Sequence, residues 1–173
     1  IICNEQVRNF KHFFTLLISF LLLNCLSAQV LYKQDFSAGF GDMILLDVDK
    51  RTPATQVASF VNAWNITGNL SDGNPAAISN SWYDPAGAAD DWMMTPVISG
   101  IDAKTYLVWS ARAIDANFPD GYQVRVSASG GSTTADFKDI VFQTNGESPD
   151  LTRRLVNLAA YVGKDIRIAF RNN

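Results

Sequence analysis

Two adjacent aspartates, Asp90 and Asp91, stand directly before the apolar run Trp92–Ile98. The aromatic start of this run predicts a strand entering a sheet. Successive side chains of a strand point to opposite faces, so the two carboxylates make a poor acid/base pair unless the backbone bulges. They are better suited to a loop that offers oxygens to a hard cation, because calcium collects about six to eight oxygen ligands. The alternative is that Asp90 caps a turn and Asp91 is solvated at the strand end.

A second acidic stretch, Asp47-Val48-Asp49, follows a short apolar run and precedes Pro53. Its D-x-D spacing is that of a metal loop, although it departs from the EF-hand pattern because Arg51 and Thr52 occupy a ligand position and the glycine position. A sandwich fold would bring the ends of several strands together at one end of the domain. We therefore expect a structural calcium ion there, with solvated aspartates and no metal as the alternative. The predicted metal ligands are Asp35, Asp47, Asp49, Asp90 and Asp91.

The first 28 of the 173 residues have the layout of a secretory signal peptide. Arg8 and Lys11 precede an 11-residue apolar run, Phe13–Leu23, and small residues follow up to Ala28. The apolar run is too short to span a membrane as a helix. The sequence thus predicts a helical signal peptide over 1–28, export to the cell surface or medium, and no membrane insertion after cleavage.

The expected leader contains both cysteines and the single histidine of the chain. The remaining domain, 29–173, therefore lacks disulfides, Cys/His zinc sites, Cys/His nucleophiles and a Ser-His-Asp triad. It keeps 12 of the 14 basic and 16 of the 17 acidic residues, which gives a net charge of −4. A mildly acidic domain without a basic cluster is a poor nucleic-acid binder.

Short alternating segments separated by Gly, Pro and Asp turns predict an all-β fold, a β-sandwich, with no long helix. The expected strands are 30–36, 64–67, 76–82, 92–98, 106–111, 122–128, 140–142, 151–158 and 166–171. The clearest is 122–128, with Tyr122, Val124 and Val126 predicted to face inward. Segment 106–111 is apolar on both alternating sets, as in a central strand covered on both sides.

Four segments resemble, in this order, the cleaved-adhesin or choice-of-anchor J domains of secreted bacterial proteins, which include gingipain-type adhesins. They are 90–96, 122–127, 158–163 and 166–173. The resemblance spans about 30–173. It implies a MAM-like jelly-roll β-sandwich of two antiparallel sheets that often carries structural calcium and forms one module of a longer chain. The sequence stops before the acidic last strand expected of the family, so the domain 29–173 is expected to be truncated at its C-terminal strand.

These features favour a secreted or cell-surface, non-catalytic adhesion or recognition module that binds extracellular protein or glycan. One alternative is an accessory, carbohydrate- or substrate-binding module of a secreted hydrolase. A second is an enzyme with two catalytic carboxylates, for which Asp84, Asp115 and Asp120 are formal candidates. Aspartates in turns usually cap or are solvated, so we expect no enzyme.

Aromatic residues beside turns are the candidates for ligand contact, because an exposed ring can stack on a sugar. They are Trp82, Tyr83 and Phe118. Tryptophan is buried on average, so core packing is the alternative for Trp82 and Tyr83.

Overall fold

The computed structural model describes residues 29–68 and 73–173, so the expected signal peptide lies outside the described residues. Leu31–Asn173 forms one compact unit. Within the described ranges the fold is all-β, with three single-turn 3-10 helices: η1 (Thr55–Val57), η2 (Thr134–Asp136) and η3 (Ala159–Tyr161). No helix in these ranges is long and apolar enough to cross a membrane.

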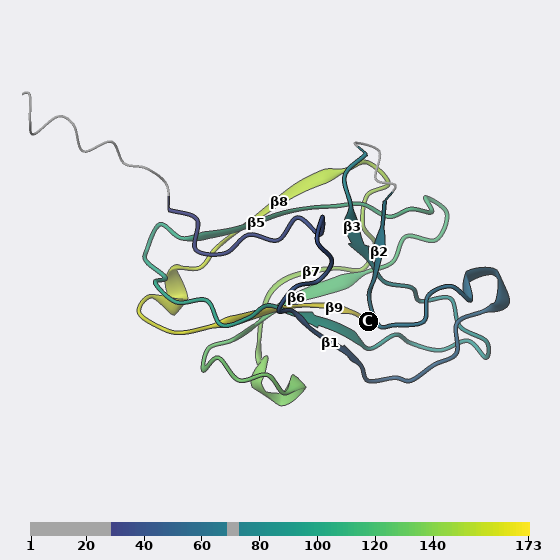
Figure 1. Ribbon diagram of the computed structural model, residues 1–173, viewed down its shortest axis with the longest axis horizontal. Helices are drawn as coiled ribbons and strands as arrows, with labels where there is room; N and C mark the ends of the chain where they lie inside the picture. Colours follow the sequence, from purple (N-terminus) through teal and green to yellow (C-terminus); the bar gives the residue numbers. More distant parts are fainter. Residues whose placement is uncertain (1–28, 69–72) are drawn as a thin grey trace, which may run out of the picture. The chain divides into compact units, whose positions relative to one another are not determined.

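The described residues form three antiparallel sheets (Figure 1). The largest has the strand order β1-β4-β9-β6-β7, and the pairs β2-β3 and β5-β8 form the other two. The strands are β1 (Ile44–Asp47), β2 (Asn65–Thr67), β3 (Ala76–Ile78), β4 (Asp91–Met94), β5 (Tyr106–Ala111), β6 (Tyr122–Ser127), β7 (Asp139–Thr144), β8 (Thr152–Asn157) and β9 (Arg167–Asn172). The predicted antiparallel β-sandwich is confirmed.

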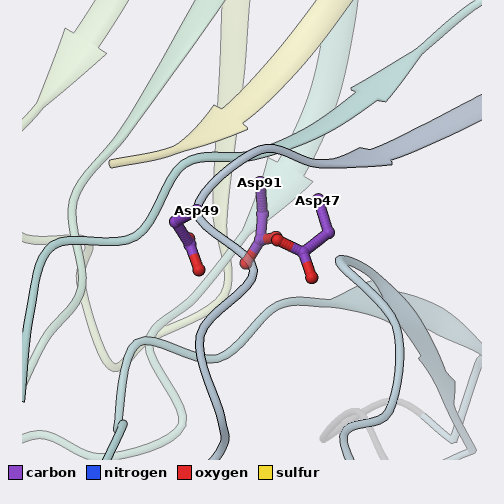
Figure 2. Close-up of side chains that lie close together, drawn as sticks. All are labelled: Asp47, Asp49 and Asp91. Carbon is purple, nitrogen blue, oxygen red and sulfur yellow. The ribbon is translucent and has the colours of Figure 1, made fainter. Parts of the chain in front are cut away.

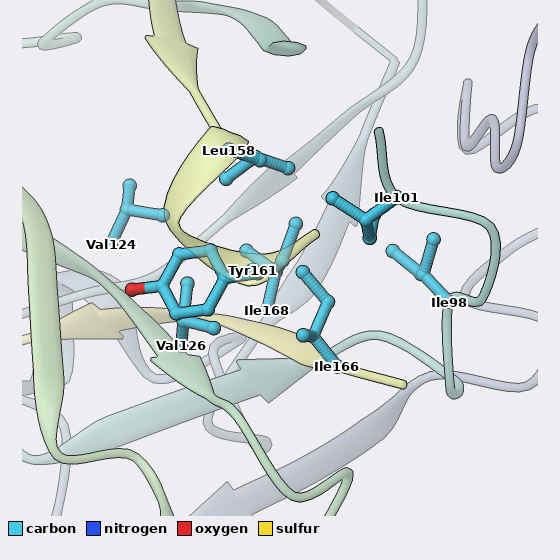
Figure 3. Close-up of a cluster of buried hydrophobic side chains, with 8 residues drawn as sticks. All are labelled: Ile98, Ile101, Val124, Val126, Leu158, Tyr161, Ile166 and Ile168. Carbon is cyan, nitrogen blue, oxygen red and sulfur yellow. The ribbon is translucent and has the colours of Figure 1, made fainter. Parts of the chain in front are cut away.

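The main core lies between the inner face of the five-stranded sheet and the β5-β8 pair (Figure 3). Val124 and Val126 of β6 and Ile168 of β9 supply the sheet side, and Leu107 and Trp109 of β5 pack against them. The inward direction predicted for alternate residues of β6 is therefore confirmed. Each fully buried aliphatic side chain contributes about 1.5–3 kcal/mol to folding.

The outer face of the five-stranded sheet is also partly covered. Phe137, which follows η2, packs on Trp92 and Met94 of β4, and the Trp92 and Phe137 ring centroids lie 5.7 Å apart. Gln123 and Ser127, two polar residues of β6 on the same face, are also buried. Strand alternation predicts their outward direction but not their burial. The side chains of Arg125, Arg171 and Gln143 form hydrogen bonds with Gln123.

An ion pair with a buried carboxylate and a half-buried guanidinium joins the two layers of the sandwich. Glu147, in the turn after β7, pairs with Arg154 of β8 at 2.5 Å, and the side chain of Glu147 is 3 % exposed. The Tyr122 hydroxyl of β6 donates to Glu147 Oε2 at 2.9 Å and accepts from Trp109 Nε1 of β5 at 2.9 Å. This chain of hydrogen bonds ties the β5-β8 pair to the larger sheet.

Two strand predictions are wrong. Segment 30–36 is irregular, because Leu31 and Tyr32 pack on the main core and Phe36, at φ 61°, turns the chain. Segment 106–111 is a strand, β5, but it is not central: among the described residues it pairs with β8 alone, and its outward residues Tyr106 and Val108 are exposed. Apolar residues on both faces of a strand therefore do not guarantee that other elements cover both faces.

Candidate cation site

The register of β1 and β4 places two of the predicted aspartates opposite each other. Asp47 is the last residue of β1, Asp91 is the first of β4, and the two are direct partners in the ladder. Asp49 follows two residues later, where the chain leaves β1. One carboxylate oxygen of each of the three lies within 4.8 Å of the others (Figure 2).

The loop after β1 is shaped by its own carboxylates. Asp47 Oδ1 accepts from the Lys50 amide at 2.6 Å, and Asp49 Oδ1 accepts from the Arg51 amide at 2.8 Å. Asp49 Oδ2 also accepts from the Asp90 amide at 2.5 Å, which ties the loop to the start of β4. Lys50 is at φ 52°, in the left-handed region that lets the chain turn back so sharply.

Asp91 is the buried member of this group, with 4 % exposure. Its Oδ2 accepts from the Tyr83 hydroxyl at 3.1 Å and from the Ser79 hydroxyl at 3.2 Å. Burial raises the pKa of Asp91 to about 6, and the neighbouring Asp49 charge adds to this rise, although the two hydroxyl donors oppose it. Burial and the Asp91 charge likewise raise the pKa of Tyr83.

The donor set fits calcium. Two oxygens bound to one calcium ion at about 2.4 Å each are at most about 4.8 Å apart, and the three carboxylate oxygens lie within 4.8 Å of one another. Asp47 Oδ2 and Asp91 Oδ1 accept no hydrogen bond from the residues that the structure describes. A cavity of about 210 Å³, which Asn62 and Asn80 also line, borders the three and has room for water ligands.

The other two predicted ligands lie outside this group. Asp90 points to the opposite face from Asp91, as strand alternation predicts, and pairs with Arg171 at 2.6 Å and with Trp92 Nε1 at 2.6 Å. Asp35 is exposed and accepts from the Ser37 hydroxyl at 2.7 Å. Hydrogen bonds from Ser37 and Lys33 lower the pKa of Asp35 to about 2.

The three candidate contact aromatics have different surroundings. Trp82 and Phe118 are 56 % and 79 % exposed, whereas Tyr83 is 7 % exposed and hydrogen-bonded to Asp91. The Ser81 hydroxyl donates to Asp120 Oδ1, and this bond joins the segment carrying Trp82 to the segment carrying Phe118. Tyr83 thus supports the acidic group, and the other two remain available at the surface.

Sequence reasoning missed Ser79, a residue that supports the acidic group through a hydrogen bond to Asp91. Ser79 donates to Asp91 and receives the Asn172 amide at 3.0 Å, so it connects the site to the end of β9. Serines after a short strand are common turn residues, and nothing in their spacing from Asp91 distinguishes Ser79.

The sequence matches no protein-family model and no curated protein. The fold is similar to those of two solved cleaved adhesin domains of Lys-gingipain. The K3 domain, from Porphyromonas gingivalis W83, aligns with TM-score 0.59 and 20 % identity over 82 % of this chain and 86 % of that domain. The K2 domain aligns with TM-score 0.60 and 17 % identity over 82 % and 88 %. The chain therefore has the fold of cleaved adhesin domains.

Proposed function

We propose that this chain is an exported, non-catalytic adhesion module of a longer protein that binds extracellular protein or glycan surfaces. The observation that carries the proposal is the fold, which two adhesin domains share over most of their length. The exposed Trp82 and Phe118 support it, since exposed aromatics are the usual anchors of recognition surfaces. The bond from Ser81 to Asp120 holds the segments of these two rings together.

We propose that a calcium ion stabilises this module without contacting its binding partner. Bound by Asp47, Asp49 and Asp91, it neutralises a cluster of like charges and fixes the loop that follows β1. The same cation strengthens the join between β1, which is an edge strand, and β4. The ion stabilises the module, and Trp82 and Phe118 make the contact with the partner.

The test is adhesion of the full chain to immobilised extracellular-matrix proteins and to a glycan array. The double variant Trp82→Ala/Phe118→Ala should lose at least about tenfold in affinity for whichever surface the wild type binds. Val162→Ala removes an apolar side chain in a different loop that is about as exposed as Trp82, 52 % against 56 %, and serves as the control. Equal binding by the double variant and the control would refute the assignment of the contact surface.

A further inference from the structure

Two arginines share one tryptophan on the outer face of the five-stranded sheet. The guanidinium carbons of Arg125 on β6 and Arg171 on β9 lie 5.8 and 5.2 Å from the Trp92 ring centroid. Asp90 pairs with Arg171, and Arg125 forms no ion pair within the described part of the chain. This spot is therefore positive although the chain as a whole has a net charge of −3.

Both guanidiniums are held in place and keep donors free. Arg125 donates through Nε to Gln123 Oε1 at 2.6 Å and through one terminal nitrogen to the Phe137 carbonyl at 3.1 Å. Arg171 donates through Nε to Asp90 at 2.6 Å and weakly to Gln123 at 3.4 Å. Across residues 29–68 and 73–173 the second terminal nitrogen of each arginine makes no hydrogen bond. An arginine fork fixed in this way is pre-organised for a carboxylate or sulfate.

Side-chain amides continue the polar surface beyond the arginines. Gln123 donates to Gln143 of β7 at 3.3 Å, and Gln143 donates to Asn145 at 3.4 Å. Trp92, Arg171, Gln123 and Gln143 are direct ladder partners and form one row across β4, β9, β6 and β7, which is about 14 Å at the usual strand spacing. Amides donate to and accept from hydroxyl groups, so a row of them beside a cationic pair matches a chain of sugars that carries acidic groups.

We propose that this outer face binds an acidic oligosaccharide, with Arg125 and Arg171 holding a carboxylate or sulfate and Gln143 and Asn145 contacting sugar hydroxyls. The proposal rests on the adhesion function and names the class of glycan. A bound anion supplies the partner that Arg125 lacks and offsets the repulsion between the two guanidiniums. Burial, followed by the nearby Arg171 charge, lowers the pKa of Arg125, which agrees with a site that gains from an anion.

The test is calorimetric titration of the full chain with four probes: a sulfated hexasaccharide, an unsulfated uronic-acid hexasaccharide, a neutral hexasaccharide and hexaglutamate. At least one acidic hexasaccharide should bind, and the comparison of the two shows whether sulfate or carboxylate is preferred. Arg125→Gln should weaken that binding by about tenfold or more, and Gln143→Ala should weaken it by a smaller factor. The control Arg153→Gln removes an exposed arginine of β8 and should leave the affinity within about twofold.

Arg171→Gln should also weaken binding, but it leaves Asp90 without its cation and can cost stability. If that variant does not fold, Arg125→Gln alone decides. Binding of neither acidic hexasaccharide, equal binding of the neutral one, hexaglutamate binding as tight as the oligosaccharides, or an unchanged affinity in Arg125→Gln would overturn the proposal. A chain that adheres through Trp82 and Phe118 but ignores both acidic hexasaccharides refutes this inference alone. A chain that binds nothing in either experiment refutes the adhesion function as well.

Discussion

Asp47 lies directly opposite Asp91 in the register of β1 and β4, so two like charges face each other across an antiparallel pair. Such pairs are destabilising without a compensating charge. Asp49 brings a third carboxylate to the same point, and Asp91 is buried there. The arrangement is unfavourable for the metal-free protein and suited to a bound cation.

Calcium should therefore raise the melting temperature. At a hundredfold excess over the dissociation constant the gain is about 2.7 kcal/mol, or roughly 5–10 °C for a domain of this size. Asp47→Asn and Asp49→Asn should each abolish most of the shift, and Asp35→Asn, outside the group, should leave it intact. Melting curves in calcium and in chelator measure this effect. A wild type with no shift rules out the site, and a shift that survives both substitutions rules out the ligands.

Asp91→Asn should have opposite effects with and without the metal. In chelator the variant should be as stable as the wild type or more so, because a buried charge is removed while an amide oxygen still accepts from Tyr83 and Ser79. In calcium it should be less stable than the wild type, since a charged ligand is lost. Urea unfolding in both buffers compares the two free energies. A loss of equal size in both buffers would mean that Asp91 acts only through its hydrogen bonds.

The opposite directions of Asp90 and Asp91 could be predicted from sequence, and the composition of the site could not. Strand alternation correctly places Asp90 and Asp91 on opposite faces. That Asp47 is the partner of Asp91 depends on a strand pairing across more than 40 residues, which is fixed by packing and not by local pattern. Five ligands were predicted because charge and turn position alone do not reveal that Asp90 pairs with Arg171.

For the fold as well, local sequence pattern predicts some features, and tertiary contacts determine the others. Strands with clean alternation, such as β6 and β9, were predicted within about a residue. Segment 30–36 has the composition of a strand, yet Leu31 and Tyr32 are used as a cover for the main core. Trp92 is buried on the outer face beside Phe137, and no periodicity predicts where Phe137 lies.

Removing the Glu147 carboxylate should loosen the two layers of the sandwich. Glu147→Gln keeps an oxygen acceptor but leaves Arg154 without its counter-charge, and it should lower the free energy of unfolding by about 2–3 kcal/mol at pH 7. Burial acts to raise the pKa of Glu147, but Arg154, the Ser148 amide and Tyr122 outweigh it, so that pKa lies below its usual value.

This lowered pKa sets the pH dependence. A carboxyl with a lower pKa in the folded state stabilises the fold above its unfolded pKa and loses that contribution as pH falls through its folded pKa. The stability difference between wild type and Glu147→Gln should therefore be full at pH 7 and shrink below about pH 4.5. Denaturant unfolding of both proteins from pH 7 to pH 3 gives the difference. A constant difference over this range would show that the charge is not involved.

The exposed face of the β5-β8 pair should tolerate substitution much better than the main core does. Leu155 of β8 is exposed and pairs with Val108, so Leu155→Ala should change the free energy of unfolding by less than about 0.5 kcal/mol. Ile168→Ala, in the main core, should cost about 2–5 kcal/mol. Denaturant melts of both variants compare them, and a large loss for Leu155→Ala would mean that another layer covers β8 in solution.

The most direct test of the adhesion proposal is to follow binding and chemical change in one sample. The full chain, in calcium, is incubated with each surface or glycan that it retains in the adhesion screen, and the ligand is then recovered and analysed by mass spectrometry. We predict saturable binding that Trp82→Ala/Phe118→Ala weakens, with the ligand recovered unaltered. Cleavage or modification of the ligand by the chain, or no retention on any surface, would contradict the account.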